Sequence, residues 1–219
     1  MLFRSPTSCG PLARLRLCGP TQYRGVCSRT RFRFSSAAVT AVIMELAEPR
    51  VRTGVWAHTS FRVDPIRRLR RTGLAAMVTI YGARSTAEAM IARVRRMHDM
   101  VAGTTPSGEA YCANDPELLT WVQSTAAYGF LRAYHAYVRP LSLSERDCYY
   151  AEGIAPAALY GATGAPRSEA DLERRFQAAT GRLERSDIVF EFLAIMRSTP
   201  ILPLPLRPFQ HLLVRAAMI

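Results

Sequence analysis

The sequence contains no lysine, and all 29 of its basic residues are arginine, against 17 acidic residues. Acids are also missing from the first 44 positions, which carry seven of the arginines. The rest of the chain is therefore only mildly basic, and a basic total alone does not indicate nucleic-acid binding. An arginine-only composition is typical of a GC-rich coding sequence, so we expect a bacterial source.

Cysteine is scarce and forms no recognisable pattern. Five cysteines are present, none in a CxxC pair, so no zinc site is predicted. The odd total without a regular framework predicts reduced thiols in a cytoplasmic protein. The chain also lacks the GxGxxG, P-loop, GxSxG and HExxH motifs, so nucleotide chemistry, serine hydrolysis and zinc proteolysis have no residue support.

No alternating strand pattern and no internal repeat are present, so we predict a single all-α domain of roughly eight to ten helices. Residues 1–36 are arginine- and serine-rich and broken by glycine and proline, which predicts a disordered or non-native basic tail before a helical domain over 37–219. Pro200, Pro203 and Pro205 exclude a membrane-spanning helix in the apolar C-terminal stretch. The amphipathic segment 208–219 either lies on a membrane surface or closes the core, and it stops without a cap, as in a helix cut short. The helices are expected over 37–46, 50–58, 64–81, 85–102, 115–139, 142–160, 168–179, 188–196 and 208–219.

The helix expected over 64–81 carries a cluster of arginines. Asp64 is a good N-cap, and Pro65 suits the first helical position. Arg68 and Thr72 share one face with two alanines, and Arg71 lies beside them. Guanidinium groups pair well with carboxylates such as haem propionates, or donate to bound oxygen. The alternative is a basic helix surface that binds acidic partners.

The next helix places a histidine on its apolar face, and the short link between the two helices predicts that they are neighbours. His98 therefore points inward, within reach of the cavity that Arg68 and Thr72 face. A neutral imidazole is a good axial ligand for haem iron, while the alternative is a core histidine satisfied by a neighbouring carbonyl. The residues of the apolar face are Ala87, Met90, Ile91, Val94, Met97, His98 and Val101.

Three further polar residues accompany the apolar run near the start of the domain. Glu45, Glu48 and His58 either line the cofactor pocket, as a base or as distal-side groups, or face solvent at helix ends. For Glu45 we favour the solvent-facing position, and for Glu48 and His58 both positions remain open. His135, which lies among tyrosines, is expected at a helix interface.

Five segments in fixed order carry a family resemblance: LAEPRV, VWAHTSFRVDPIRRLRRT, ARVRRMHDMVAGT, YCANDPELLTWV and YVRPLSLSERDCYYAEG. From Ala41 onward, the chain resembles the MpaB-type oxygenase / latex clearing protein (rubber oxygenase) catalytic-domain family. That family is all-α, and its characterised members bind haem b and cleave substrates with dioxygen. The resemblance implies that His98 is the proximal iron ligand and that Arg68 and Thr72 are the polar pair near the haem. In rubber oxygenases a lysine caps the distal side where this chain has Arg71, and arginine is a poor iron ligand because it stays protonated.

The sequence therefore predicts a haem b-dependent oxygenase or related oxidoreductase, with its iron-containing haem pocket between helices. Its expected reactants are dioxygen and a small hydrophobic, isoprenoid-like substrate, with no nucleic-acid partner. The alternatives are a non-catalytic haem-binding protein, and a helical interaction or membrane-surface protein without a cofactor. Catalytic roles are assigned to Arg68, Thr72, Arg71 and Glu48, and cofactor contacts to His98, Arg68, Thr72 and His58.

Overall fold

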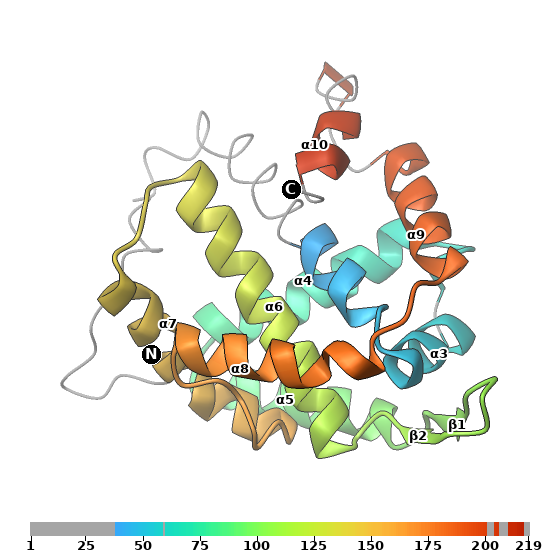
Figure 1. The fold of residues 1–219 in the computed structure, drawn as a ribbon, viewed down its shortest axis with the longest axis horizontal. Helices are drawn as coiled ribbons and strands as arrows, with labels where there is room; N and C mark the ends of the chain where they lie inside the picture. Colours follow the sequence, from blue (N-terminus) through green and yellow to red (C-terminus); the bar gives the residue numbers. More distant parts are fainter. Residues whose placement is uncertain (1–37, 59, 201–203, 206–209, 217–219) are drawn as a thin grey trace.

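Helices make up nearly all of the regular structure in the computed structural model, which describes residues 38–58, 60–200, 204–205 and 210–216 (Figure 1). This architecture confirms the all-α prediction. The predicted tail over 1–36 lies outside the described residues. Among the described helices, none combines the length and the apolarity that a membrane crossing would need. A helix over 38–45 is followed by α3 (Pro49–Ala57), α4 (Pro65–Tyr81), α5 (Arg84–His98), β1 (Ala102–Thr104), β2 (Ala110–Cys112), α6 (Pro116–Tyr137), α7 (Leu143–Tyr160), α8 (Glu169–Ala179), η2 (Thr180–Arg182), α9 (Asp187–Ser198) and α10 (Gln210–Ala216).

Side-chain caps set several of the helix starts, among them the predicted cap at Asp64. The Asp64 carboxylate accepts a hydrogen bond from the backbone N–H of Arg67 at 3.0 Å and so begins α4. Asp115 caps α6 in the same way. Ser142 and Glu145 form a complete capping box at the start of α7.

The helix that carries His98 ends earlier than expected. The sequence predicts helix to residue 102, but α5 stops at His98. Beyond it, the chain enters a small antiparallel hairpin, in which Ala102 pairs with Cys112. The backbone carbonyl of Val101 accepts the N–H of Ala113 at 2.9 Å. Because these backbone groups bond across the hairpin, they are not available for helical hydrogen bonds, and the helix ends at His98 although the apolar pattern continues to Val101.

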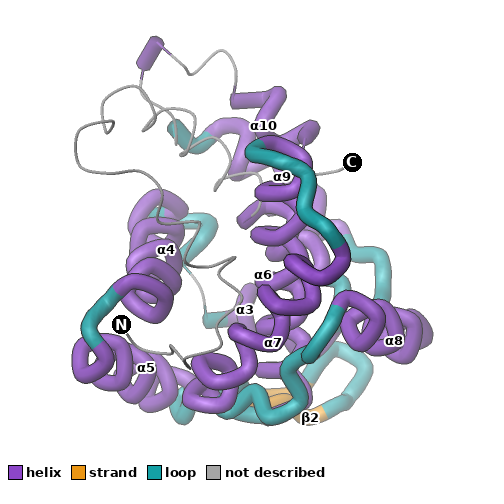
Figure 2. Tube along the Cα trace, turned by 90° about the vertical axis from the view of Figure 1, so that its left-hand side faces the viewer, coloured by secondary structure: helices purple, strands orange, loops and turns teal. Residues whose placement is uncertain are grey.

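The buried core leaves α4 and α5 at one side of the molecule (Figure 2). One cluster joins the helix over 38–45 to α9 and α10 around Phe61 and Phe192, and others surround α6. The two helices α4 and α5 pack against each other, as predicted. However, α4 has no fully buried residue. The rest of the described chain therefore leaves much of the surface of α4 uncovered, and this helix carries the candidate residues Arg68, Arg71 and Thr72.

Candidate functional site

Arg68 and Thr72 form a polar pair on one face of α4. The guanidinium Nη1 of Arg68 donates to Thr72 Oγ1 at 2.9 Å, and the threonine hydroxyl donates to the Arg68 carbonyl at 3.1 Å. The guanidinium also lies over the ring of Phe61, 5.6 Å from its centroid, a cation–π distance. Phe61 is buried and makes an edge contact with Phe192 at 5.5 Å. The ring of Phe61, a core residue, therefore contacts the Arg68 guanidinium and helps to fix its position.

Glu45 is half-buried and does not simply face solvent as expected, and its carboxyl lies close enough to Arg68 for the two charges to interact. Burial raises the pKa of Glu45 to about 7, and the nearby positive charge of Arg68 opposes that rise. Burial likewise lowers the pKa of Arg68, and Glu45 opposes that shift, whereas Arg71 adds to it. Charge interactions of this kind show that Glu45 and Arg68 share one partly desolvated environment.

His98 lies at the end of α5, and Arg68 acts on it too. Its ring nitrogen Nδ1 is buried and has no hydrogen-bond partner among the described residues. Burial lowers the pKa of His98, the charge of Arg68 lowers it further, and Asn114 and Asp99 oppose the shift. Burial and Arg68 therefore favour the neutral form of the imidazole, and no described carbonyl accepts a hydrogen bond from Nδ1. We call Glu45, Arg68, Thr72 and His98 the Arg68 cluster.

Arg71 lies beside this cluster and reaches the neighbouring helix. Its Nη2 is 3.3 Å from the sulfur of Met97, the residue before His98. The side chain is exposed and forms no ion pair with any described carboxylate. Arg71 therefore contributes positive charge at the edge of the cluster.

Glu48 and His58 have contacts of a different kind. Glu48 is buried, and its carboxylate accepts the backbone N–H of Val51 at 2.7 Å and the Nε of Arg50 at 2.8 Å, which caps α3. His58 is exposed and forms the C-cap of α3 through its backbone. In the described part of the chain, no recorded contact joins either residue to the Arg68 cluster. We therefore leave both out of the proposed site.

His135, expected at a helix interface, has a structural role. Its Nδ1 accepts the backbone N–H of Leu141 at 2.9 Å, which ties the end of α6 to the following loop. No group of three or more His, Cys, Asp or Glu side chains that could hold a metal ion occurs among the residues that the structure describes.

The fold is all-α, and the candidate site combines an arginine–threonine pair with a half-buried histidine whose pKa the arginine lowers. The chain belongs to the family described as ER-bound oxygenase mpaB/B'/Rubber oxygenase, catalytic domain, whose model matches residues 26–218. This match confirms the family that the sequence motifs indicate. Comparisons with curated proteins and with solved structures found no match. Family membership gives the chain an oxygenase role, with dioxygen and an oxidisable substrate as reactants.

Proposed function

We propose that this oxygenase depends on haem b and that His98 is the protein ligand to its iron. The observation that carries the proposal is the buried Nδ1 of His98, which has no partner among the described residues. Burial and the charge of Arg68 lower the pKa of this imidazole, so the ring offers a free lone pair at neutral pH. A haem iron takes one such imidazole on its proximal side.

The surrounding residues suit an anionic cofactor. Haem, when bound, supplies the oxygen chemistry, while the protein supplies ligand, orientation and electrostatics. The Arg68 guanidinium can donate to a propionate carboxylate. Thr72 and Phe61 fix the direction of that guanidinium. Glu45, whose pKa is about 7, can hold or release a proton at its carboxyl near neutral pH.

A hydrophobic substrate is the second part of the proposal. Beyond Thr72, the face of α4 continues with Ala75 and Ala76, which are small and only partly buried. Thr79, one turn further, shares a hydrogen bond of 2.9 Å with the hydroxyl of Tyr160, which ties this end of α4 to α7. The face of α4 beyond Arg68 and Thr72 therefore carries small apolar side chains that remain partly accessible, which suits contact with an isoprenoid-like hydrocarbon.

Absorption spectroscopy of the full chain, expressed with ample haem, tests the ligand assignment. We expect a Soret band and a haem b pyridine haemochrome in the wild type, and loss or strong alteration of the band in His98→Ala. The matched control is His58→Ala, because His58 is exposed and should leave the spectrum unchanged. A band indifferent to His98→Ala would contradict this ligand, and a colourless protein after reconstitution would contradict haem dependence.

Oxygen uptake with squalene, an unsaturated hydrocarbon, tests the substrate class. We expect uptake by the wild-type haem protein and its loss in His98→Ala. Haem binding without uptake on any unsaturated hydrocarbon would instead favour a haem-binding protein that senses or stores haem.

A further inference from the structure

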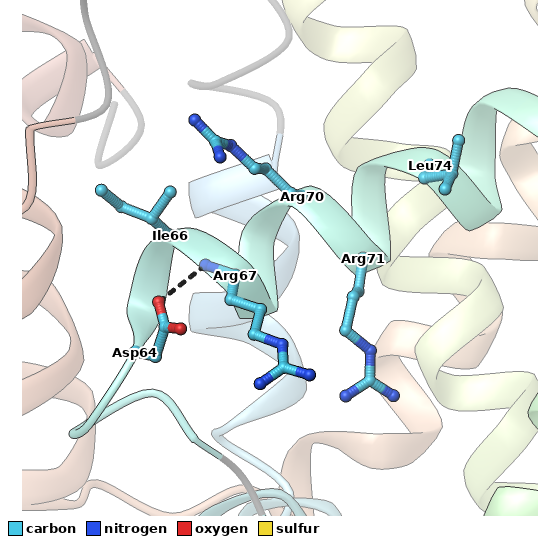
Figure 3. A pocket seen from close by; sticks show the side chains of 6 residues that line it. All are labelled: Asp64, Ile66, Arg67, Arg70, Arg71 and Leu74. Atoms are coloured by element: carbon cyan, nitrogen blue, oxygen red, sulfur yellow. Dashed lines mark hydrogen bonds between the residues drawn. The ribbon is translucent and has the colours of Figure 1, made fainter.

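A cavity of about 390 Å³ lies along α4, on the flank next to the face that carries Arg68 and Thr72. Its volume falls in the range of small-molecule sites. Figure 3 shows its lining, which combines charged and apolar side chains of the N-terminal half of the helix. The lining residues are Asp64, Ile66, Arg67, Arg70, Arg71 and Leu74.

The arginines of this cavity have no carboxylate partner. All 17 acidic residues of the chain lie in the described part, and none forms an ion pair with Arg67, Arg70 or Arg71. Asp64, the only acid in the lining, is a helix cap that accepts the backbone N–H of Arg67. Like charges this close on a helix destabilise each other. A bound anion would remove that repulsion.

The directions of the side chains favour one anionic group. Arg67 and Arg71, one helical turn apart, extend to the same side of α4, whereas Arg70 extends to the other side (Figure 3). Two neighbouring guanidinium groups suit the oxygens of a single carboxylate or phosphate. Ile66 and Leu74 add apolar surface at the two ends of the cavity, and the Leu74 side chain is 57% exposed.

We propose that this cavity binds an amphiphilic anion, with a carboxylate or phosphate head between Arg67 and Arg71 and a hydrocarbon chain along Ile66 and Leu74. The same chemistry is offered by a free amphiphile and by the headgroup of an anionic membrane lipid. The site is separate from the Arg68 cluster except at Arg71, which lies at the edge of that cluster and contacts Met97 beside His98.

Calorimetric titration of the full chain with dodecanoate, dodecyl phosphate and uncharged 1-dodecanol tests the first source. We expect both anions to bind, and the Arg67→Gln/Arg71→Gln variant to lose about tenfold or more in affinity, as for lost charge-assisted hydrogen bonds. The matched control is Arg93→Gln/Arg96→Gln on α5, which removes the same charge from two exposed arginines that pair with no described carboxylate. Its affinity should stay within about twofold of the wild type.

Co-sedimentation with phosphatidylcholine vesicles, with and without phosphatidylglycerol, tests the membrane source. Retention on the anionic vesicles alone, lost in the Arg67→Gln/Arg71→Gln variant but not in its control, would identify a lipid headgroup. The proposal is overturned if the two double variants behave alike in both assays, or if dodecanol binds as tightly as the anions. Leu74→Glu, at an exposed position, provides a second variant should the first not fold, and it should also abolish binding. Repeating the titration in His98→Ala separates this proposal from the haem assignment, because binding should persist there.

Discussion

Replacing Glu45 with glutamine should make the domain more stable at neutral pH. The gain in unfolding free energy should depend on pH. Burial raises the pKa of this carboxyl from 4.5 to about 7, despite the nearby positive charge of Arg68. The folded state therefore favours the protonated acid. The stability that Glu45 contributes is complete below about pH 4.5 and is lost as the pH rises through about 7.

The size of the effect follows from the same shift. A rise from 4.5 to about 7 corresponds to at most about 3 kcal/mol of unfolding free energy, since one pKa unit is worth 1.36 kcal/mol. Glutamine keeps the shape of the side chain but does not titrate. The difference in unfolding free energy, Glu45→Gln minus wild type, should therefore increase by up to about 3 kcal/mol between pH 4.5 and pH 7.5.

Urea unfolding followed by far-UV circular dichroism at several pH values measures this difference. His98 has a lowered pKa, so its contribution to stability is lost as the pH falls below 6.5. Both proteins contain His98, so its contribution largely cancels in the difference. Glu173→Gln, at an exposed acid of α8, controls for the loss of one carboxyl charge. A difference that is independent of pH, or that shrinks as the pH rises, would refute an enclosed, protonated Glu45.

Three other substitutions, one of them with a matched control, should be measurable by the same unfolding assay. Gly161→Ala places a side chain at φ +102° at the C-cap of α7 and should cost about 1–2 kcal/mol, whereas Gly181→Ala, which meets nothing within 4 Å, should change stability by less than about 0.5 kcal/mol. Phe61→Leu removes the ring beneath Arg68 and one aromatic edge contact, and should cost about 1–2 kcal/mol. Asp115→Ala removes the cap of α6 and should cost about 1 kcal/mol, and an unchanged midpoint would show that the cap is not stabilising.

Local chemistry made most helix starts predictable, whereas one helix end depended on distant residues. Asp64, Asp115 and Ser142 cap helices through side chains next to them in the sequence, so the sequence alone identifies them. The end of α5 is different, because the apolar pattern continues to Val101. Pairing with residues that follow several positions later, around Cys112, ends the helix instead.

The candidate site likewise contains features that local sequence predicts and features that depend on distant residues. The Arg68–Thr72 pair follows from helical spacing, and the charge of Arg68 also acts on the His98 imidazole. The position of Phe61 against Arg68 depends on packing with Phe192 of α9, far along the chain, so no local sequence pattern predicts it. The burial of Glu45 did have a signal. Its helix over 38–45 is apolar except at Thr40 and Glu45, and so apolar a helix packs against the core rather than standing in solvent.

Arg68 interacts electrostatically with both Glu45 and His98. Replacing it should therefore change the pKa of His98. Its positive charge lowers the pKa of His98 beyond the effect of burial. Arg68→Gln should therefore raise that pKa, so that a larger fraction of the imidazole carries a proton near neutral pH and cannot bind a metal.

An NMR titration of the histidine ring protons measures this shift in the protein without haem. The chain has four histidines, and His98→Ala identifies the relevant signal. Thr72→Val is the matched control, because it removes the hydrogen bond at Arg68 but keeps the charge, and it should leave the titration of His98 nearly unchanged. If Arg68→Gln leaves the pKa of His98 where it is, or lowers it, then burial alone keeps this imidazole neutral. The arginine would in that case act only on whatever anion it binds.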